Sequence, residues 1–306
     1  MRGARHTSPM HVVVAGSHGF IGSALCRSLR AGGHRVSTLV RGGAHGPDEI
    51  PWDPPAGRLD PRALAGADAV VDLAGVSVSS RPLTAKRKRE VVSSRVDTAG
   101  LVARTLAAHP QTPRVFLQAS GIGAYGPRGD TVVDEGEPLG TTFFADVVRQ
   151  WEAAAAPAQD AGVRVVFLRT GVVLGRGGGA LAPLWPLLLL GLGGRIGSGD
   201  QYWSWITLHD EVRAIEHLLG ADVEGPVNLV ARADRNRDVV RALAHALSRP
   251  AWTAAPEWAV RLALRDFADE IVGSLRATPA ALTSSGFRPD HPDLATAAAW
   301  LVAHGA

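Results

Sequence analysis

The chain has 306 residues, of which 46% are hydrophobic and 20% charged, the proportions of an ordinary globular protein. They exclude disorder and collagen-like repetition, and a single cysteine, Cys26, excludes a disulfide scaffold within the chain. The 32 basic and 29 acidic residues give a formal charge of +3, which does not argue for a nucleic-acid partner.

No segment has the pattern of a secretory signal or a membrane span. The most apolar stretch, residues 181–192, is broken by two prolines and a glycine and is shorter than the ~20 residues that a spanning helix needs. Met1–Pro9 is basic and polar, and either Met1 or Met10 could begin the native chain. We therefore expect a cytoplasmic protein that acts on a small molecule, without nucleic acid or membrane as partner; a homodimer is among the expected states.

Short β-branched runs alternate with segments of helical periodicity up to about residue 168. The first helix ends at Gly32-Gly33, and Asp60-Pro61 is typical of a helix start. This alternation favours a parallel sheet covered by helices on both faces. The predicted strands are 11–15, 36–40, 50–53, 69–73, 115–119 and 163–168, and the later helices are 60–64, 84–108 and 143–161.

Beyond Gly175 the rhythm breaks at the glycines of 177–179 and 193–194. A helix over 210–219 and a strand over 227–230 favour a return of the chain to the main sheet. Residues 238–306 are mostly helical by their period, which indicates a smaller domain over the ends of the strands.

The clearest motif is a G-x-x-G-x-x-G turn between the first strand and the first helix. Its first glycine permits a tight turn, the second lets the backbone approach a pyrophosphate, and the third lets helix and strand pack closely. The N–H groups at the start of the helix then face the phosphates. The predicted phosphate-binding residues are Gly16, Ser17, His18, Gly19, Phe20, Ile21 and Gly22.

Arg41 follows the second strand at the position where an NAD site has a carboxylate for the ribose 2′-hydroxyl. No Asp or Glu occurs before Asp48, and an arginine fork suits a 2′-phosphate. The sequence therefore predicts NADP(H) as the cofactor, against the alternative of a solvated arginine at a strand end.

Several segments together resemble the extended short-chain dehydrogenase/reductase superfamily, and within it the atypical epimerase-family proteins of the YfcH type. The resemblance implies a Rossmann-type doubly wound parallel sheet of the α/β class with a smaller, mostly helical C-terminal substrate domain. The segments that carry it are 15–22, 68–75, 94–97, 120–126, 151–152, 168–174, 196–199 and 205–210, with a similar tail from Pro256 onward.

Domain limits and further cofactor contacts follow from this resemblance. The NADP-binding domain is expected over 10–175, with 206–230 returning to it, and the substrate domain over 176–205 and 231–306. Residues at the strand ends would border the cofactor, namely Leu73, Ala74, Gly75, Ala119, Thr170, Gly171 and Val172.

The usual catalytic Tyr-x-x-x-Lys of the superfamily is missing. When Glu152 is aligned with the acidic residue that usually follows this motif, Phe144 and Val148 stand at the Tyr and Lys positions. Neither side chain can carry a proton. Tyr125 and Ser120 are the substitute candidates for catalysis, with a structural role for Tyr125 equally open. Arg149 and Glu152 stand at i, i+3 spacing, which favours a surface pair over a catalytic one.

The leading hypothesis is an NADP(H)-dependent oxidoreductase or epimerase acting on a small polar metabolite. The alternative is an NADPH-binding sensor, or a protein that regulates a partner, without catalysis. Arg41 and the missing base disfavour a nucleotide-sugar epimerase that keeps NAD bound. The eleven histidines show no metal-ligand spacing, so we expect no metal site. The aromatic cluster Tyr202, Trp203 and Trp205 fits core packing and a substrate cleft equally well.

Overall fold

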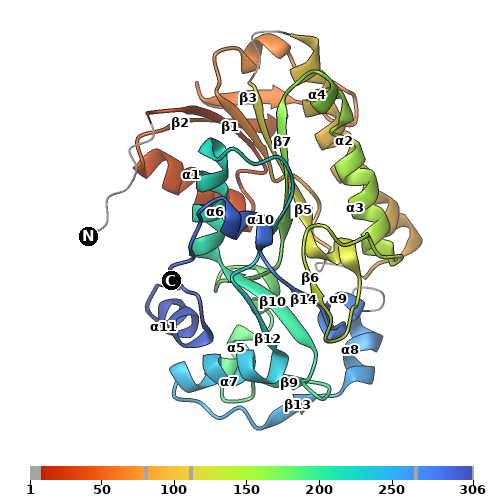
Figure 1. Ribbon diagram of the computed structural model, residues 1–306, viewed down its shortest axis with the longest axis vertical. Helices are drawn as coiled ribbons and strands as arrows, with labels where there is room; N and C mark the ends of the chain where they lie inside the picture. The colour runs from red at the N-terminus through yellow and green to blue at the C-terminus, as the bar shows by residue number, and fades with distance from the viewer. Residues whose placement is uncertain (1–7, 79–81, 110–112, 265–267, 305–306) are drawn as a thin grey trace.

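The computed structural model describes residues 8–78, 82–109, 113–264 and 268–304. Most of the basic and polar segment 1–9 lies outside these ranges. The main feature of the fold is a seven-stranded parallel sheet in the order β11-β7-β5-β4-β1-β2-β3 (Figure 1). The strands are β1 (His11–Ala15), β2 (Arg35–Arg41), β3 (Glu49–Trp52), β4 (Ala69–Asp72), β5 (Val115–Gly121), β7 (Arg164–Thr170) and β11 (Gly225–Leu229).

Helices cover both faces of this sheet, as its unbroken apolar strands require. In β1 the side chains of Val12 and Val14 pack with α1 (Phe20–Ala31) and α6 (Leu208–Gly220). Val13 and Ala15 face the other side, where α2 (Ala85–Ala108), α4 (Ala156–Asp160) and the 3-10 turn η1 (Pro61–Leu64) contribute the core. The predicted α/β class with a doubly wound parallel sheet is therefore confirmed.

The order of the strands reverses at β1. The chain runs from β1 outward to β2 and β3, then crosses to β4 on the other side and continues through β5, β7 and β11. In open α/β sheets, a ligand binds in the crevice outside the carboxyl ends of the strands at such a reversal. The fold thus places a binding crevice between β1 and β4.

A second part of the molecule lies below the carboxyl ends of the strands in Figure 1. Three short sheets build it: β8 (Val172–Leu174) with β10 (Tyr202–Thr207) and β12 (Arg232–Arg235), β9 (Gly194–Ile196) with β13 (Thr253–Ala255), and β6 (Val132–Val133) with β14 (Arg276–Ala277). Its helical elements are η3 (Gly179–Leu181), α5 (Trp185–Leu189), α7 (Asn236–Ala246), α8 (Glu257–Leu264), α9 (Ala268–Val272) and α11 (Leu294–His304). α10 (Ala280–Ser284) packs back against β11.

One predicted helix is interrupted. The segment expected to be a single helix over 143–161 forms α3 (Phe143–Ala153) and α4, which begins at Ala156 with Pro157 in its first turn. Proline has no N–H to donate to the preceding turn, so the helix breaks there. Among the described residues, none of the helices is both long and apolar enough to cross a bilayer.

Candidate functional site

The glycine turn closes tightly against two neighbouring elements. Gly16 has φ +77°, and a Cβ on it would lie 2.7 Å from the carbonyl carbon of Leu73. A Cβ on Gly22 would lie 2.2 Å from the carbonyl oxygen of Gly16. Glycine is therefore required at both positions. At Gly16 it lets the turn lie against the end of β4, and at Gly22 it lets α1 pack closely against the end of β1.

The N-terminus of α1 is available to an anion. Gly19 precedes it in an extended conformation, no side chain caps the helix, and its first turn holds no acidic residue. Ser17 and the exposed His18 lie beside it, their side chains 3.3 Å apart. Free N–H groups and the positive end of the helix dipole suit a phosphate at this place.

Phe20 fills the space above the turn. A Cβ on Gly175 would lie 2.5 Å from its ring, and one on Gly178 would lie 2.6 Å away. The glycines after β8 thus make room for this ring, which fixes the segment that follows the sheet against the start of α1.

Arg41 lies at the carboxyl end of β2 and lines a groove of about 510 Å³ together with Trp52 and Arg58. Arg58 is paired with Asp53 at 2.6 Å. The guanidinium of Arg41 has no hydrogen bond or ion pair within the described parts of the chain. The fork of Arg41 is therefore free to meet an anion in this groove.

The residues that follow β4 are fixed by side chains of the protein interior. The Asp72 carboxylate accepts the N–H of Ala74 at 2.9 Å, and the Arg95 guanidinium lies against Gly75 and donates to Val76 O at 3.2 Å. Burial raises the pKa of Asp72 to about 6 although the Ala74 N–H opposes it. Leu73, Ala74 and Gly75 consequently form a fixed rim of the crevice.

Ser120 and Thr170 lie at the carboxyl ends of the neighbouring strands β5 and β7. Ala119 precedes Ser120 in β5, and Gly121, the last residue of β5, pairs with Thr170. Gly171 and Val172 continue from Thr170 into β8. All the predicted cofactor residues thus come to the carboxyl ends of five strands, β1, β2, β4, β5 and β7.

Ser120 belongs to a buried polar network. Its hydroxyl donates to Glu152 Oε1 at 2.7 Å, and both carboxylate oxygens of Glu152 accept from Arg169 at 2.8 Å. The interpretation of Arg149 and Glu152 as a surface pair is wrong, because Arg149 pairs with Asp146 instead. Glu152 faces inward, and its partner lies on β7 rather than on its own helix.

Tyr125, in the 3-10 turn η2 (Ile122–Tyr125), lies behind this network. Its hydroxyl accepts from Arg169 at 2.9 Å and donates to Asn228 Oδ1 at 2.8 Å, and its side chain is 1% exposed. Burial raises the pKa of the phenol, against the opposing influence of Arg169. The hydroxyl is fully engaged by protein groups, whereas Ser120 is nearer to the strand ends.

Phe144 and Val148, which stand at the positions of the usual Tyr and Lys, have apolar neighbours in the structure. Val148 is buried in a small cluster with Tyr125 and Val133. Phe144 is half-buried and contacts Phe143 edge to face, with ring centroids 5.1 Å apart. No proton can pass through either side chain.

Glu211 is a residue that the sequence did not single out. It lies in the first turn of α6, is fully buried, and accepts the hydroxyl of Thr170 at 2.8 Å. Burial raises its pKa to about 8. Acidic residues at a helix start are ordinary, so only the tertiary contact with β7 distinguishes it.

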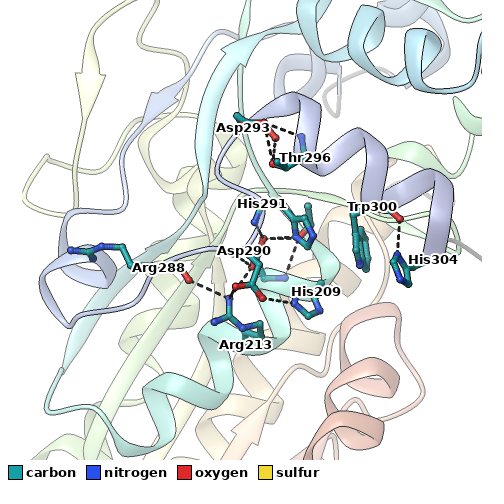
Figure 2. Close-up of polar contacts among 11 residues, drawn as sticks. His209, Arg213, Arg288, Asp290, His291, Asp293, Thr296, Trp300 and His304 are labelled. Carbon is teal, nitrogen blue, oxygen red and sulfur yellow. Dashed lines mark hydrogen bonds and ion pairs between the residues drawn. The ribbon is translucent and has the colours of Figure 1, made fainter. Parts of the chain in front are cut away.

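The neighbouring Asp210 holds the C-terminal segment, and Figure 2 labels its partners Arg213, Asp290 and His291. Its carboxylate accepts the N–H groups of Asp290 at 2.7 Å and His291 at 3.0 Å, and Arg213 pairs with both Asp210 and Asp290. Burial opposes ionisation, but these hydrogen bonds outweigh it and lower the pKa of Asp210.

His209, Asp210 and Asp290 bring ligand atoms within 4.8 Å of one another. The ring N–H of His209 donates to Asp290 Oδ2 at 2.9 Å, and the rings of His209 and His291 pack around Trp300. The Arg213 guanidinium pairs with both carboxylates and offsets part of their charge, and the cluster joins α6 to the segment that precedes α11.

The two tryptophans of the aromatic cluster belong to the core. Trp203 and Trp205 are 3% and 0% exposed, and their indole N–H groups donate to Ile271 O and Asp234 Oδ2. A cavity of about 230 Å³ lies near the start of β10, and its lining includes Asp130, Gln201 and Arg235. The lining mixes polar side chains with apolar ones such as Ile196 and Val272, and Arg235 pairs with Asp130 at 2.9 Å.

The sheet reversal, the glycine turn and the strand-end crevice define a protein of the Rossmann class. The chain belongs to the NAD dependent epimerase/dehydratase family, which its residues 12–230 match, and residues 255–301 match a domain of unknown function, DUF1731. The resemblance expected from the sequence is thereby confirmed at the level of this family.

Relatives of known sequence align over nearly the whole chain. Epimerase family protein Mb2239 of Mycobacterium bovis is 42% identical over 92% of this chain and 93% of its own length. The human epimerase family protein SDR39U1 is 36% identical over 96% of this chain and 100% of its own. A crystal structure of human SDR39U1 (isoform 2) with NADPH superimposes with a TM-score of 0.88, at 34% identity over 96% of this chain and 100% of that one.

Proposed function

We propose that this protein is an NADP(H)-dependent oxidoreductase or epimerase of the YfcH type that acts on a small polar metabolite. The observation that carries the proposal is the free guanidinium of Arg41 at the end of β2, the strand next to β1, in a groove over β2 and β3. A site for NAD would instead need a carboxylate there. The NADPH-bound structure of the human relative supports the same cofactor.

The residues present fit this cofactor. The uncapped start of α1 would bind the pyrophosphate, Arg41 the 2′-phosphate, and the rims at Leu73–Gly75 and Thr170–Val172 the nicotinamide half. Bound NADPH supplies a hydride. The polar side chains among the lining of the 230 Å³ cavity, such as Gln201, are the observation in favour of a substrate that is small and polar.

Ser120 is the best-placed group to move a proton near the strand ends. Glu152 accepts its hydroxyl proton in a hydrogen bond, and Arg169 holds Glu152 in place. Tyr125 was the other candidate, and its direct role in proton transfer stays a prediction. Its burial and its two hydrogen bonds favour a positioning role, transmitted through Arg169.

A second function has its own support. Phe144 and Val148 replace the proton-carrying pair of the superfamily, which favours a protein that binds NADPH without turning it over. Such a protein would act as a sensor or through a partner. Oxidation of NADPH by a carbonyl substrate would exclude this alternative, whereas a complex that is silent toward carbonyl substrates and changes its oligomeric state with NADPH would favour it.

The deciding experiment is a fluorescence titration of the nucleotide-free protein with NADPH and with NADH. We expect NADPH to bind more tightly, and Arg41→Ala to weaken NADPH binding by about tenfold to a hundredfold while NADH binding is unchanged. Arg35→Ala, at the opposite end of β2, is the matched control and should behave as wild type. Equal affinity for both nucleotides in the wild type would contradict the proposal.

A further inference from the structure

Glu211 is a carboxyl group enclosed beneath a strand end of the crevice. It is fully buried, Thr170 Oγ1 donates to its Oε1 at 2.8 Å, and its Oε2 has no hydrogen-bond partner among the described residues. An unpartnered carboxylate oxygen in the interior costs free energy when ionised. The function proposed above gives this group no task.

Within the part of the chain that the structure describes, no charged side chain compensates Glu211. Burial is the main influence on its pKa, opposed only by the hydroxyl of Thr170. On its own helix, Asp210 and Arg213 are turned toward Asp290. The other titratable residues of this helix are His209, which bonds Asp290, His217, which bonds Ser285, and Glu216.

The titratable groups packed against α6 from other parts of the chain include His291, which bonds Asp210, and the buried thiol of Cys26. The others are the exposed Arg27 and Arg30 on α1, Arg164 and Arg169 on β7, and Tyr202 on β10.

These neighbouring groups have other partners or lie in solvent. Arg169 pairs with Glu152, Arg164 donates to carbonyl groups at the far end of α6, and Tyr202 lies under the guanidinium of Arg235. Besides the hydroxyl of Thr170, the dipole of α6 favours an ionised Glu211, because the residue lies in the first turn. Ionisation is therefore sensitive to any positive charge that is brought to the strand end.

The order of the strands decides which half of a dinucleotide approaches Thr170. The glycine turn follows β1, and the groove of Arg41 lies over β2 and β3 on one side of it. β4, β5 and β7 lie on the other side. A nucleotide whose 2′-phosphate meets Arg41 must therefore extend its nicotinamide half over the ends of β5 and β7.

We propose that Glu211 is a proton site linked to the charge of the nicotinamide ring, protonated beside NADPH and ionised beside NADP⁺. The proposal rests on the proposed NADP(H) function. The ring of NADP⁺ is positive and that of NADPH is neutral, and a nearby opposite charge favours the carboxylate. When NADP⁺ replaces NADPH, the carboxyl group becomes a carboxylate and one proton passes to solvent; no electron moves in this exchange.

The test is the ratio of the dissociation constants of NADPH and NADP⁺, measured on the full chain from about pH 6 to about pH 10. Titration of the 2′-phosphate cancels in this ratio, because both nucleotides carry it. If the ring lowers the pKa of Glu211 by about one unit, preference for NADP⁺ rises about tenfold as the pH passes through the ionisation of Glu211. Glu211→Gln should abolish the rise, and Glu216→Gln, further along α6, should retain it.

Thr170→Val removes the one hydrogen bond that favours the ionised form, so the rise should move to higher pH. If Glu211→Gln does not fold, Thr170→Val is the test variant. A rise of the ratio whose pH midpoint is the same as in the wild type then overturns the proposal. A flat ratio in the wild type, or the same rise in Glu211→Gln, also overturns it while leaving NADP(H) binding intact. Failure of both nucleotides to bind removes the proposed function and this inference together.

Discussion

Glu152 on α3 and Arg169 on β7 form a two-point ion pair in which both hydrogen bonds measure 2.8 Å and the side chains are 12% and 6% exposed. Burial alone would lower the pKa of the guanidinium, but the hydrogen bonds and charge of Glu152 reverse this and raise the pKa of Arg169. The pair joins the helix and the strand directly behind Ser120, so it contributes both to stability and to the position of that hydroxyl.

Glu152→Gln should therefore be strongly destabilising. Removing one partner of a buried pair leaves the other charge uncompensated, at a cost of about 3–5 kcal/mol. Urea denaturation followed by circular dichroism gives the change in the free energy of unfolding. The matched control is Arg149→Met, which breaks an exposed pair on the same helix and should cost less than about 1 kcal/mol. Equal losses in the two variants would contradict a buried, energetically important pair.

The partner of Glu152 illustrates what the sequence could not provide. Helical spacing considers only neighbours on one helix, and it selected Arg149, whereas Arg169 lies 17 positions away on a strand. The strands of the main sheet and the glycine turn were predictable because each is determined by a local run of residues. The sheets β9–β13 and β6–β14 were not, because their strands have two or three residues and pair with partners such as Thr253 with Gly194.

Thr170 and Glu211 show the same limit in the site itself. Thr170 was predictable as a strand-end residue, but Glu211 follows an ordinary helix start and meets Thr170 only because α6 packs against β7. Substitutes for the missing catalytic pair, Tyr125 and Ser120, follow from residue type and from their place at a predicted strand end. Only the fold shows that Tyr125 is enclosed and that Ser120 contacts Glu152.

Gly22→Ala should disrupt the crevice. The added methyl group would lie 2.2 Å from the carbonyl oxygen of Gly16, so α1 or the turn must move. Overpacking of this kind lowers the free energy of unfolding by about 1–3 kcal/mol. A loss of the same size in the free energy of binding would weaken nucleotide affinity by about tenfold or more. Nucleotide titration and thermal unfolding measure the two effects. Gly43→Ala, where a Cβ meets nothing within 4 Å, should change neither; wild-type binding by Gly22→Ala would contradict the assigned contact.

Tyr125→Phe should lower stability with little effect on nucleotide affinity. The phenol oxygen bonds both Arg169 and Asn228 in the interior, and its loss leaves two polar groups unsatisfied, at about 1–3 kcal/mol. Tyr202→Phe is the control, because the hydroxyl of Tyr202 has no hydrogen bond in the described part of the chain. Denaturant unfolding should separate the two variants. A Tyr125→Phe protein as stable as wild type would mean that its hydroxyl is not bound as described.

Asp210→Ala should release the C-terminal segment from α6. The carboxylate accepts the N–H groups of Asp290 and His291 and pairs with Arg213, so its loss removes the anchor of the turn before α11. Hydrogen exchange should accelerate in residues 288–304 more than in β1 or β4, as expected for local opening. Asp293→Ala, an exposed cap of α11, is the control and should leave residues 288–291 protected. Uniform acceleration throughout the chain would contradict a local anchor.

The stability of the protein should fall as pH rises, because of two buried acids. The pKa of Asp72 is raised by burial to about 6 and that of Glu211 to about 8, so the folded state holds protons that the unfolded state has released. Their contribution is complete below the unfolded pKa near 4 and is lost as the pH rises through the folded pKa. Between about pH 6 and about pH 8, Glu211 alone predicts a loss of about 1.4 kcal/mol for each pH unit. Unfolding in urea across this range should show that slope in the wild type and a much flatter one in Glu211→Gln. The same slope in both would mean that Glu211 ionises normally in the folded protein.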